Sequence, residues 1–240
     1  MEVVPYKETK ETKKNQVARM FNNISRKYDL LNHLLSLGID IYWRKQAIKI
    51  LKPEKPRTIL DVATGTADFA IEAAKVGPDK IIGVDIADKM LELGRIKIEK
   101  KGLSALIELK TGDSEKLDFP DNKFEAVIVS FGVRNFENLE KGLSDIYRVL
   151  DKNGTLVVLE FSKPTVFPLK QLYQFYFRFI LPLIGKLISK DQSAYSYLPE
   201  SVNAFPDGHS FVAILQKIGF KKTQWKSLTF GISSIYVGKK

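Results

Sequence analysis

The sequence of 240 residues contains no cysteine and only two histidines, His33 and His209. Without thiols, the chain cannot form disulfides, cysteine-ligated zinc or iron–sulfur sites, or a cysteine nucleophile. Two imidazoles also exclude a histidine-rich metal site, so we expect no metal centre and interpret both histidines as structural residues. The lack of cysteine fits a reducing cytoplasm.

Long uninterrupted apolar runs are absent as well. The most apolar segment, Pro168–Lys190, is interrupted by Arg178, Pro182 and Lys186, which excludes a transmembrane helix. No apolar run follows Met1, so the sequence predicts no signal peptide and a cytoplasmic location. Pro168–Lys190 predicts either a surface for an isoprenoid tail or anionic lipid, or a core or dimer-forming helix.

Basic charge is in excess but unevenly distributed. The formal net charge is +10, and residues 163–240 hold 11 Lys and Arg against 3 Asp and Glu, so the rest of the chain is nearly neutral. Such an excess is typical of partners such as nucleic acid or an anionic membrane. Because it lies beside the most apolar segment, we interpret it as attraction to an anionic membrane surface and expect no nucleic-acid partner.

Apolar periodicity predicts an α/β fold. Short β-rich runs alternate with helical stretches, which is the pattern of a doubly wound, mostly parallel sheet covered on both faces. Two final strand-like runs without an intervening helix predict an antiparallel hairpin at the sheet edge. The predicted strands are Thr58–Val62, Lys80–Val84, Leu106–Lys110, Phe124–Ser130, Gly154–Phe161, Lys222–Thr229 and Ile232–Val237, and the predicted helices are Asp68–Val76, Lys89–Lys101, Leu139–Leu150 and Asp207–Lys217.

A helical block precedes this sheet. Apolar residues at helical spacing between Gln16 and Leu51 predict two or three helices. Residues 1–15 are rich in Lys, Glu and Thr and predict a mobile arm or a fraying helix start. We therefore expect residues 1–56 to form a helical N-terminal lid and residues 57–240 a ligand-binding domain, together as one structural unit.

The first predicted strand ends in a turn suited to a nucleoside. Gly65 follows the strand and leads directly into a helix, whose N-terminal amides point at the ligand. Asp85 ends the second strand, where a carboxylate can accept both hydroxyls of a ribose. Ligands of such sheets bind beyond the carboxyl ends of the strands, where the strand order reverses. Gly65, Asp85 and the adjacent Ile86 are therefore candidate cofactor contacts.

The composition of this turn favours S-adenosylmethionine over a dinucleotide. Ala63 and Ala67 stand where a dinucleotide fold needs glycine for the close approach of a pyrophosphate. S-adenosylmethionine has no phosphate and carries a zwitterionic amino acid instead. Asp61, at the strand tip, is placed to face the ammonium group or to hold the turn, and Thr66 offers a hydroxyl and an amide.

Two further strand ends support this hypothesis. Asp113 and Ser114 follow the third strand, where an acidic side chain and an amide would bind the adenine amino group and ring nitrogen. Ser130 ends the fourth strand at the expected reversal of strand order, where it would face the sulfonium and its methyl group. Taken alone, Asp113 with Ser114 is equally compatible with a helix cap, and Gly65 with an ordinary turn.

Two longer segments resemble the signatures of the ubiquinone/menaquinone biosynthesis C-methyltransferases, a family of class I S-adenosylmethionine-dependent methyltransferases. The first is Tyr28–Arg44 and the second is Arg148–Pro164. The motif Ser130–Asn135 also matches, and the likeness extends over the chain from about Phe21 onward.

The resemblance implies a Rossmann-like, seven-stranded fold with S-adenosylmethionine as the methyl donor. It implies C-methylation of a prenylated quinol in respiratory quinone biosynthesis, from demethylmenaquinol to menaquinol, and leaves the ubiquinone-pathway benzoquinol open as a second substrate. The cofactor contacts that it carries over are Thr66, Asp85, Asp113, Ser114 and Ser130.

Methylating a quinol carbon requires removal of a phenolic proton and alignment of the ring carbon with the methyl donor. Asp68, which begins the helix after the glycine turn, is the candidate general base, although it is equally suited to complement the helix dipole. Arg134 is the candidate for stabilising the developing phenolate, with Asn135 as its hydrogen-bond partner; the alternative for Arg134 is a structural salt bridge.

Tyr28, Asn32 and Arg44 are the candidate substrate-binding residues, because the helical block that carries them would cover the pocket and exclude water. Ordinary helix packing is their alternative, and it is our interpretation of Trp43. Two other functions stay open: the same fold acting on another small molecule or an RNA base, and a non-catalytic membrane-associated scaffold. We expect transient contact with the inner face of the cytoplasmic membrane and leave a homodimer open.

Overall fold

The computed structural model describes residues 3–36, 38–180 and 193–240, apart from seven side chains within the helices. Those side chains are Leu31, His33, Leu34, Leu35, Phe177, Arg178 and Tyr195. The expectations for the side chain of His33 and for the end of the apolar segment, residues 181–190, therefore lie outside the described residues.

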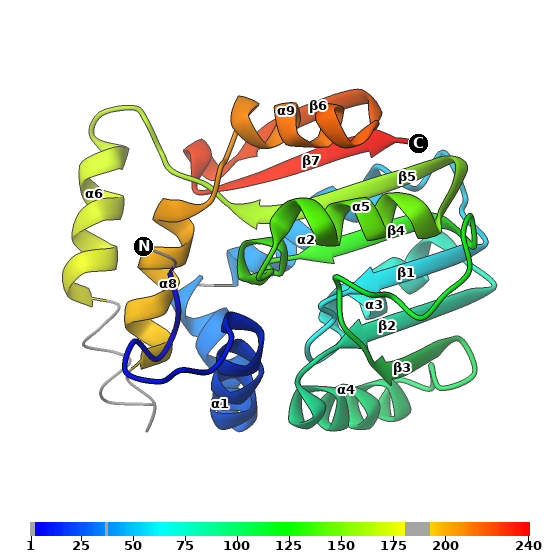
Figure 1. Cartoon of the computed structure of the whole chain (residues 1–240), viewed down its shortest axis with the longest axis horizontal. Coiled ribbons are helices and arrows are strands. Elements are labelled where there is room, and N and C mark those ends of the chain that lie inside the picture. The colour runs from blue at the N-terminus through cyan, green and yellow to red at the C-terminus, as the bar shows by residue number, and fades with distance from the viewer. Residues whose placement is uncertain (1–2, 37, 181–192) are drawn as a thin grey trace.

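The described strands form one seven-stranded sheet in the order β3-β2-β1-β4-β5-β7-β6 (Figure 1). The five strands from β3 to β5 are parallel, and β7 runs antiparallel to both β5 and β6. The strands are β1 (Thr58–Val62), β2 (Lys80–Asp85), β3 (Ile107–Thr111), β4 (Phe124–Ser130), β5 (Leu150–Phe161), β6 (Lys221–Leu228) and β7 (Ser233–Lys239). The predicted α/β fold with an antiparallel C-terminal pair is confirmed.

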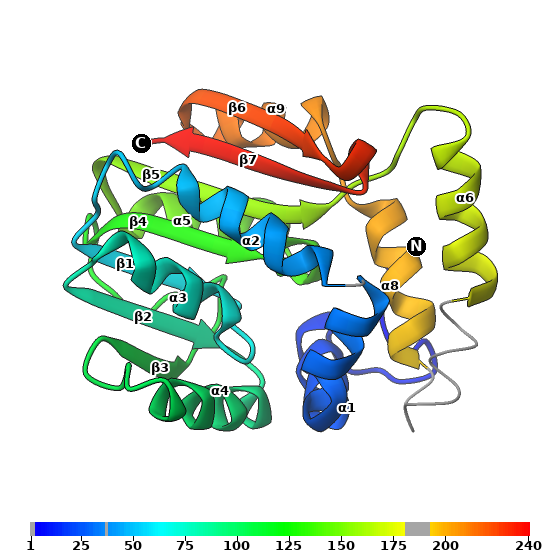
Figure 2. The same cartoon turned by 180° about the vertical axis from the view of Figure 1, so that it is seen from behind.

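Helices cover both faces of this sheet (Figures 1 and 2). One face carries α2 (Ile39–Lys49), α3 (Asp68–Ala73) and α4 (Asp88–Lys100), and the other carries α5 (Leu139–Val149) and α9 (His209–Ile218). Along β4, Ile128 belongs to the first core, whereas Val127 and Val129 belong to the second. A strand covered on both sides has no polar face, which explains the continuous apolar run in its sequence.

A third group of helices lies beyond the carboxyl ends of the parallel strands, where the arrowheads point in Figure 1. It contains α1 (Lys13–Leu35), α6 (Leu169–Phe175) with the π-helical turn η3 (Tyr176–Ile180), and α8 (Ser193–Ala204). Val17 and Met20 of α1 are buried against Ala194 and Tyr197 of α8. We call this group the roof; it joins the start of the chain to its last third.

The predicted N-terminal lid divides between two places. Helix α1 belongs to the roof, but α2 packs on the sheet, with Trp43, Ala47 and Ile48 buried in the same core as β1 and α3. Residues 3–12, expected to be mobile or fraying, lie against the roof: the Tyr6 amide donates to Gln16 Oε1 at 2.8 Å. The domain boundary at residue 56 stays a prediction.

Three short 3-10 turns lie between the described helices and strands. They are η1 (Ala74–Val76), η2 (Val133–Asn135) and η4 (Thr229–Gly231). Among the residues that the structure describes, no helix combines the length and the apolar character needed to cross a bilayer.

Candidate functional site

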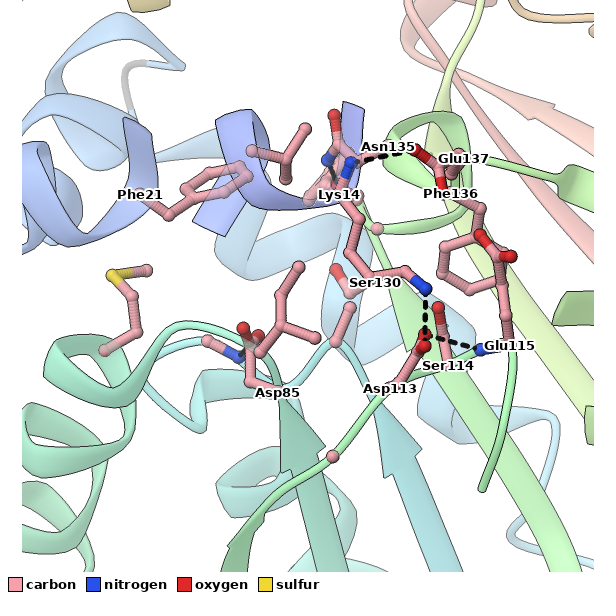
Figure 3. A pocket seen from close by; sticks show the side chains of 18 of the residues that line it. Lys14, Phe21, Asp85, Asp113, Ser114, Glu115, Ser130, Asn135, Phe136 and Glu137 are labelled. Atoms are coloured by element: carbon pink, nitrogen blue, oxygen red, sulfur yellow. Dashed lines mark hydrogen bonds and ion pairs between the residues drawn. The ribbon is translucent and has the colours of Figure 1, made fainter. Parts of the chain in front are cut away.

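Two adjoining cavities lie between the roof and the carboxyl ends of the strands. The first cavity is lined by the loops after β1, β2, β3 and β4 and by α1 (Figure 3). The second cavity, of about 350 Å³, is lined by α1, α2, α6 and α8 and by the residues that follow β4 and β5. Phe21, Tyr28 and Phe131 line both cavities. The two cavities therefore meet at three aromatic side chains, next to the junction of β1 and β4 where the strand order reverses.

Asp85 holds the turn after β1 and faces the first cavity (Figure 3). Its Oδ2 accepts the Gly65 N–H at 2.8 Å, and its Oδ1 accepts the Ala87 N–H at 2.9 Å. Burial raises the pKa of the Asp85 carboxyl, against the opposing effect of these amides. Because a carboxylate has about four lone-pair directions, Asp85 keeps acceptor capacity for hydroxyl groups of a ligand.

The turn has the backbone geometry of glycine even where its residues are alanine. Ala63, Gly65 and Ala67 have φ values of 55°, 56° and 66°, a region that costs an L-residue roughly 1–2 kcal/mol. A Cβ built on Gly132 would lie 2.6 Å from the Ala63 Cβ. The loops after β1 and β4 therefore approach each other too closely for a side chain at residue 132.

Asp61 and Thr66, both predicted as cofactor contacts, line neither cavity. Asp61 is fully buried and accepts a hydrogen bond from the Thr64 hydroxyl at 2.6 Å, and burial raises its pKa to about 7. The Thr66 hydroxyl donates to Asp29 at 2.6 Å and accepts from Lys97 at 2.9 Å. Both side chains stabilise the turn from outside the two cavities, and their contact with a cofactor stays a prediction.

Asp113 and Ser114 line the first cavity opposite Asp85 (Figure 3). Asp113 Oδ1 accepts the Glu115 N–H at 2.9 Å, and its Oδ2 pairs with Lys14 Nζ of α1 at 2.6 Å. Burial would raise the pKa of Asp113, but these hydrogen bonds and the Lys14 charge outweigh it and lower the pKa. Asp113 is thus a carboxylate acceptor at neutral pH, as binding of an adenine amino group requires.

Ser130 and Ile86 also line the first cavity. The Ser130 Oγ is buried and has no hydrogen-bond partner among the described residues. A buried hydroxyl left without a partner costs about 1–3 kcal/mol, so this atom fits one that a ligand satisfies. With Asp85 for ribose hydroxyls and Asp113 for an adenine amino group, the residues of the first cavity fit S-adenosylmethionine.

The second cavity is mostly apolar, and the charged groups at its wall form two buried ion pairs. Arg134 Nη1 contacts Glu160 Oε1 at 2.7 Å and donates to the Phe131 carbonyl at 2.6 Å. Arg44 pairs with Asp40 at 2.5 Å. Burial raises the pKa of Glu160, and the Arg134 charge opposes that shift. Both arginines line the cavity, and each carries a counterion that fixes its orientation.

Three more of the predicted substrate and catalytic residues, Tyr28, Asn32 and Asn135, line the cavities. Tyr28 hydrogen-bonds with Asn32, burial raises the Tyr28 pKa, and Asn32 lines the second cavity. Asn135 lines the first cavity, where its Nδ2 donates to the Phe131 carbonyl at 3.3 Å and its Oδ1 accepts the Tyr197 hydroxyl at 3.1 Å. The structure therefore brings Tyr28 to the boundary between the cavities and Asn135 into contact with Phe131 of that boundary.

Asp68 lies outside both cavities. Its carboxylate pairs with Lys97 of α4 at 2.5 Å, and the same ammonium pairs with Asp29 of α1 at 2.8 Å. These contacts, with Thr66, form a seam between α1 and α4. The role of Asp68 as general base stays a prediction. Its ion pair with Lys97 also gives it a structural role.

Sequence reasoning missed several residues of the site. Val17 and Phe21 of α1 stand four residues apart and line the first cavity, and Tyr28 follows seven residues later on the same helix. This spacing on one helix face was the available signal. Lys14 and Glu160 carry no such signal, because their partners Asp113 and Arg134 lie far away in the sequence.

Comparisons with known proteins agree with this geometry. Residues 7–240 match the model of the ubiE/COQ5 methyltransferase family. The chain is 50% identical to a demethylmenaquinone methyltransferase of Bacteroides fragilis, over 95% of this chain and 94% of that protein. It is 43% identical to a ubiquinone/menaquinone biosynthesis C-methyltransferase of Geotalea daltonii, over 95% of this chain and 97% of that protein.

Solved structures support the fold. A S-adenosylmethionine-dependent methyltransferase of Thermotoga maritima, described as a possible histamine N-methyltransferase, superimposes with a TM-score of 0.66 at 20% identity, over 92% of this chain and 99% of that one. A putative one from Methanococcus maripaludis gives a TM-score of 0.60 at 17% identity, over 98% and 97%. The chain therefore belongs to the ubiE/COQ5 methyltransferase family and is an S-adenosylmethionine-dependent methyltransferase.

Proposed function

We propose that this chain methylates a ring carbon of a prenylated quinol, with demethylmenaquinol as the substrate. The observation that carries the proposal is the second cavity: it is large and mostly apolar, and it meets the first cavity at Phe21, Tyr28 and Phe131. Such a cavity suits a fused aromatic ring with an isoprenoid tail. The names of the relatives from Bacteroides fragilis and Geotalea daltonii support the same substrate class.

The roles of the residues follow from the two cavities. Asp85, Asp113 and Ser130 would hold S-adenosylmethionine, which supplies an electrophilic methyl group when bound. Phe21, Tyr28 and Phe131 at the boundary would position the quinol ring and exclude water from the reacting atoms. The ring carbon gains a methyl group and loses its hydrogen as a proton, so the chain must also provide a path for that proton.

Arg134 is the residue best placed to stabilise a phenolate. Its guanidinium is held by Glu160 at 2.7 Å, and its Nε is buried without a hydrogen-bond partner among the described residues. A free N–H donor on a residue that lines the cavity fits a substrate oxygen that becomes negative as the phenolic proton leaves. Asn135 would orient the loop through its bond to the Phe131 carbonyl.

The test is methyl transfer by the purified protein. Labelled S-adenosylmethionine is supplied with demethylmenaquinol, with a ubiquinone-pathway benzoquinol, or with total RNA, and the products are identified by mass spectrometry. We expect a ring-methylated menaquinol, and a loss of at least about 100-fold in rate for Arg134→Met, since removing a hydrogen-bond donor from a developing oxyanion costs that much. Label in RNA, or in neither quinol, would contradict the proposal.

We further propose that this protein draws its quinol from a membrane surface. Val166, Phe167, Leu172 and Phe175 lie on or just before α6 and are 55–76% exposed, and Leu172 also lines the second cavity. An exposed apolar patch at the mouth of a cavity for a lipid substrate supports contact with a bilayer. The location at the inner face of the cytoplasmic membrane stays a prediction. The homodimer also stays a prediction, which sedimentation analysis would test.

A further inference from the structure

The start of α1 covers the first cavity. Lys14 and Phe21 of this helix lie above the strand ends (Figure 3), and Val17 also lines the cavity. About 60 Å³ of space remains inside, whereas pockets for ligands of drug size typically measure about 300–1,000 Å³. S-adenosylmethionine therefore requires side chains that reach into the cavity, Lys14 among them, to move aside.

Four contacts hold the start of α1 down, and all of them reach the loops after β3 and β4. Lys14 Nζ pairs with Asp113 at 2.6 Å, and the Lys14 N–H donates to Glu137 Oε1 at 3.4 Å. Lys13 Nζ donates to the Phe136 carbonyl at 2.8 Å and to the Arg134 carbonyl at 3.4 Å. The Lys14–Asp113 pair differs from the others, because it uses the side chain to which we assign the adenine amino group.

We propose that Lys14 is a latch: its ammonium occupies the Asp113 carboxylate in the closed protein, and cofactor binding exchanges that ammonium for the amino group of adenine. Lys14 and Asp113 both line the first cavity, so the ammonium takes the space beside the carboxylate that an adenine amino group would need, and the two N–H donors compete for it. Figure 3 shows the Lys14 side chain descending from α1 to Asp113 across the cavity. The inference rests on the cofactor contact proposed for Asp113.

The exchange lowers the apparent affinity of the protein for the cofactor. When only a fraction of the protein is in the binding-competent state, the apparent Kd is the intrinsic Kd divided by that fraction. The side chains of Lys14 and Asp113 are each 29% exposed, and pairs of this kind are worth at most about 1 kcal/mol, which is about fivefold. The latch should therefore weaken cofactor binding by about two- to fivefold at low salt.

The experiment measures binding of S-adenosylhomocysteine by isothermal titration calorimetry. Lys14→Met removes the ammonium, Lys14→Arg keeps a charged donor, and Lys10→Met removes an equal charge from an exposed residue as the matched control. We expect Lys14→Met to bind about two- to fivefold more tightly than the unaltered protein, and the other two variants to bind like it. Because S-adenosylhomocysteine has no net charge, salt should tighten its binding to the unaltered protein and leave Lys14→Met unchanged.

Unchanged or weaker binding by Lys14→Met would overturn the latch. Unchanged binding would mean that Lys14 has no effect on cofactor binding, and weaker binding would mean that Lys14 contacts the cofactor directly. The double variant Lys14→Met with Asp113→Leu separates this failure from that of the underlying contact, because it has neither the latch nor an acceptor oxygen at residue 113. If Asp113 binds adenine, the double variant binds S-adenosylhomocysteine more weakly than Lys14→Met alone; if the two bind equally well, the Asp113 contact itself is wrong. Circular dichroism melts of every variant show whether the fold is intact.

Discussion

At the scale of single residues, Asp61 is a carboxyl whose buried environment differs strongly from water. It is fully buried behind the turn that carries Gly65, and burial raises its pKa to about 7 from an ordinary value near 3.8. Between about pH 4 and 7, the native protein keeps a proton on Asp61 that the unfolded chain has released. Stability therefore falls as the pH rises through this window, and the full cost is present above pH 7.

Replacing Asp61 by asparagine should flatten this dependence. Asparagine cannot ionise, and its carbonyl oxygen can still accept the Thr64 hydroxyl. From pH 5 to pH 8, the free energy of unfolding of Asp61→Asn should rise by about 2 to 3 kcal/mol relative to that of the unaltered protein. Denaturant unfolding at both pH values measures the gain, with the exposed Asp118→Asn as control. Parallel pH curves for the two proteins would show that Asp61 does not titrate in this range.

The candidate site was predictable wherever residues follow a strand directly. Asp85, Asp113 and Ser130 were found because the carboxyl ends of parallel strands must meet at one edge of a sheet, and all three line the first cavity. The Lys14 contact was not predictable, since a lysine in a lysine-rich segment carries no pattern, and its partner is 99 residues away. Contacts of that kind arise only once the chain has folded.

At the scale of elements, the seam between α1 and α4 gives Asp68 a structural role. Lys97 of α4 pairs with both Asp68 and Asp29, which joins the roof to the helix that follows β2. These side chains are 24–33% exposed, so each pair contributes at most about 1 kcal/mol. Asp68 and Asp29 share one ammonium, and loss of either leaves the other paired.

The variant Asp68→Asn separates this role from that of a general base. We expect a loss of about 0.5 to 1 kcal/mol in stability, with kcat changed less than about threefold and the pH dependence of kcat intact. Thermal melts and a pH–rate profile are the measurements, and Glu72→Gln on the same helix is the control. Disappearance of the acidic limb of the profile would instead identify Asp68 as the base.

The strands were easier to predict than the roof. Those of the parallel part are buried on both sides, so their apolar runs stand out; β4 was predicted with the observed bounds. Helix α8 was not predicted, since SAYSYLPESVNA is short of large apolar residues and contains Pro199. It is fixed by tertiary packing, with Ala194 and Tyr197 buried against α1, and a local pattern does not report such packing.

At the scale of the whole molecule, charge and apolar surface gather on the same third of the chain. Residues 163–240 carry most of the basic excess, and this region also supplies the exposed side chains Val166, Phe167, Leu172 and Phe175. Lysine beside exposed aromatic residues is typical of proteins that rest on anionic lipid. The charge and the second cavity would then serve one substrate.

Vesicle binding tests this interpretation. We expect cosedimentation with phosphatidylglycerol-containing vesicles to exceed that with phosphatidylcholine alone, and to fall as salt rises. The double variant Phe167→Ser with Phe175→Ser should bind at least about tenfold more weakly, because two apolar rings no longer enter the interface. Ile96→Ser, an exposed apolar residue of α4, should bind normally. Binding insensitive to salt and lipid charge would leave the basic excess as a solubility feature.

The boundary of Phe21, Tyr28 and Phe131 has a further consequence for how the reactants arrive. The first cavity lies over the ends of β1, β2, β3 and β4, and the second lies over the β4 and β5 ends beneath α6 and α8. With the methyl donor in the first cavity and the quinol in the second, the two reactants would face each other across these three rings. Only the methyl group would then have to pass from one cavity to the other.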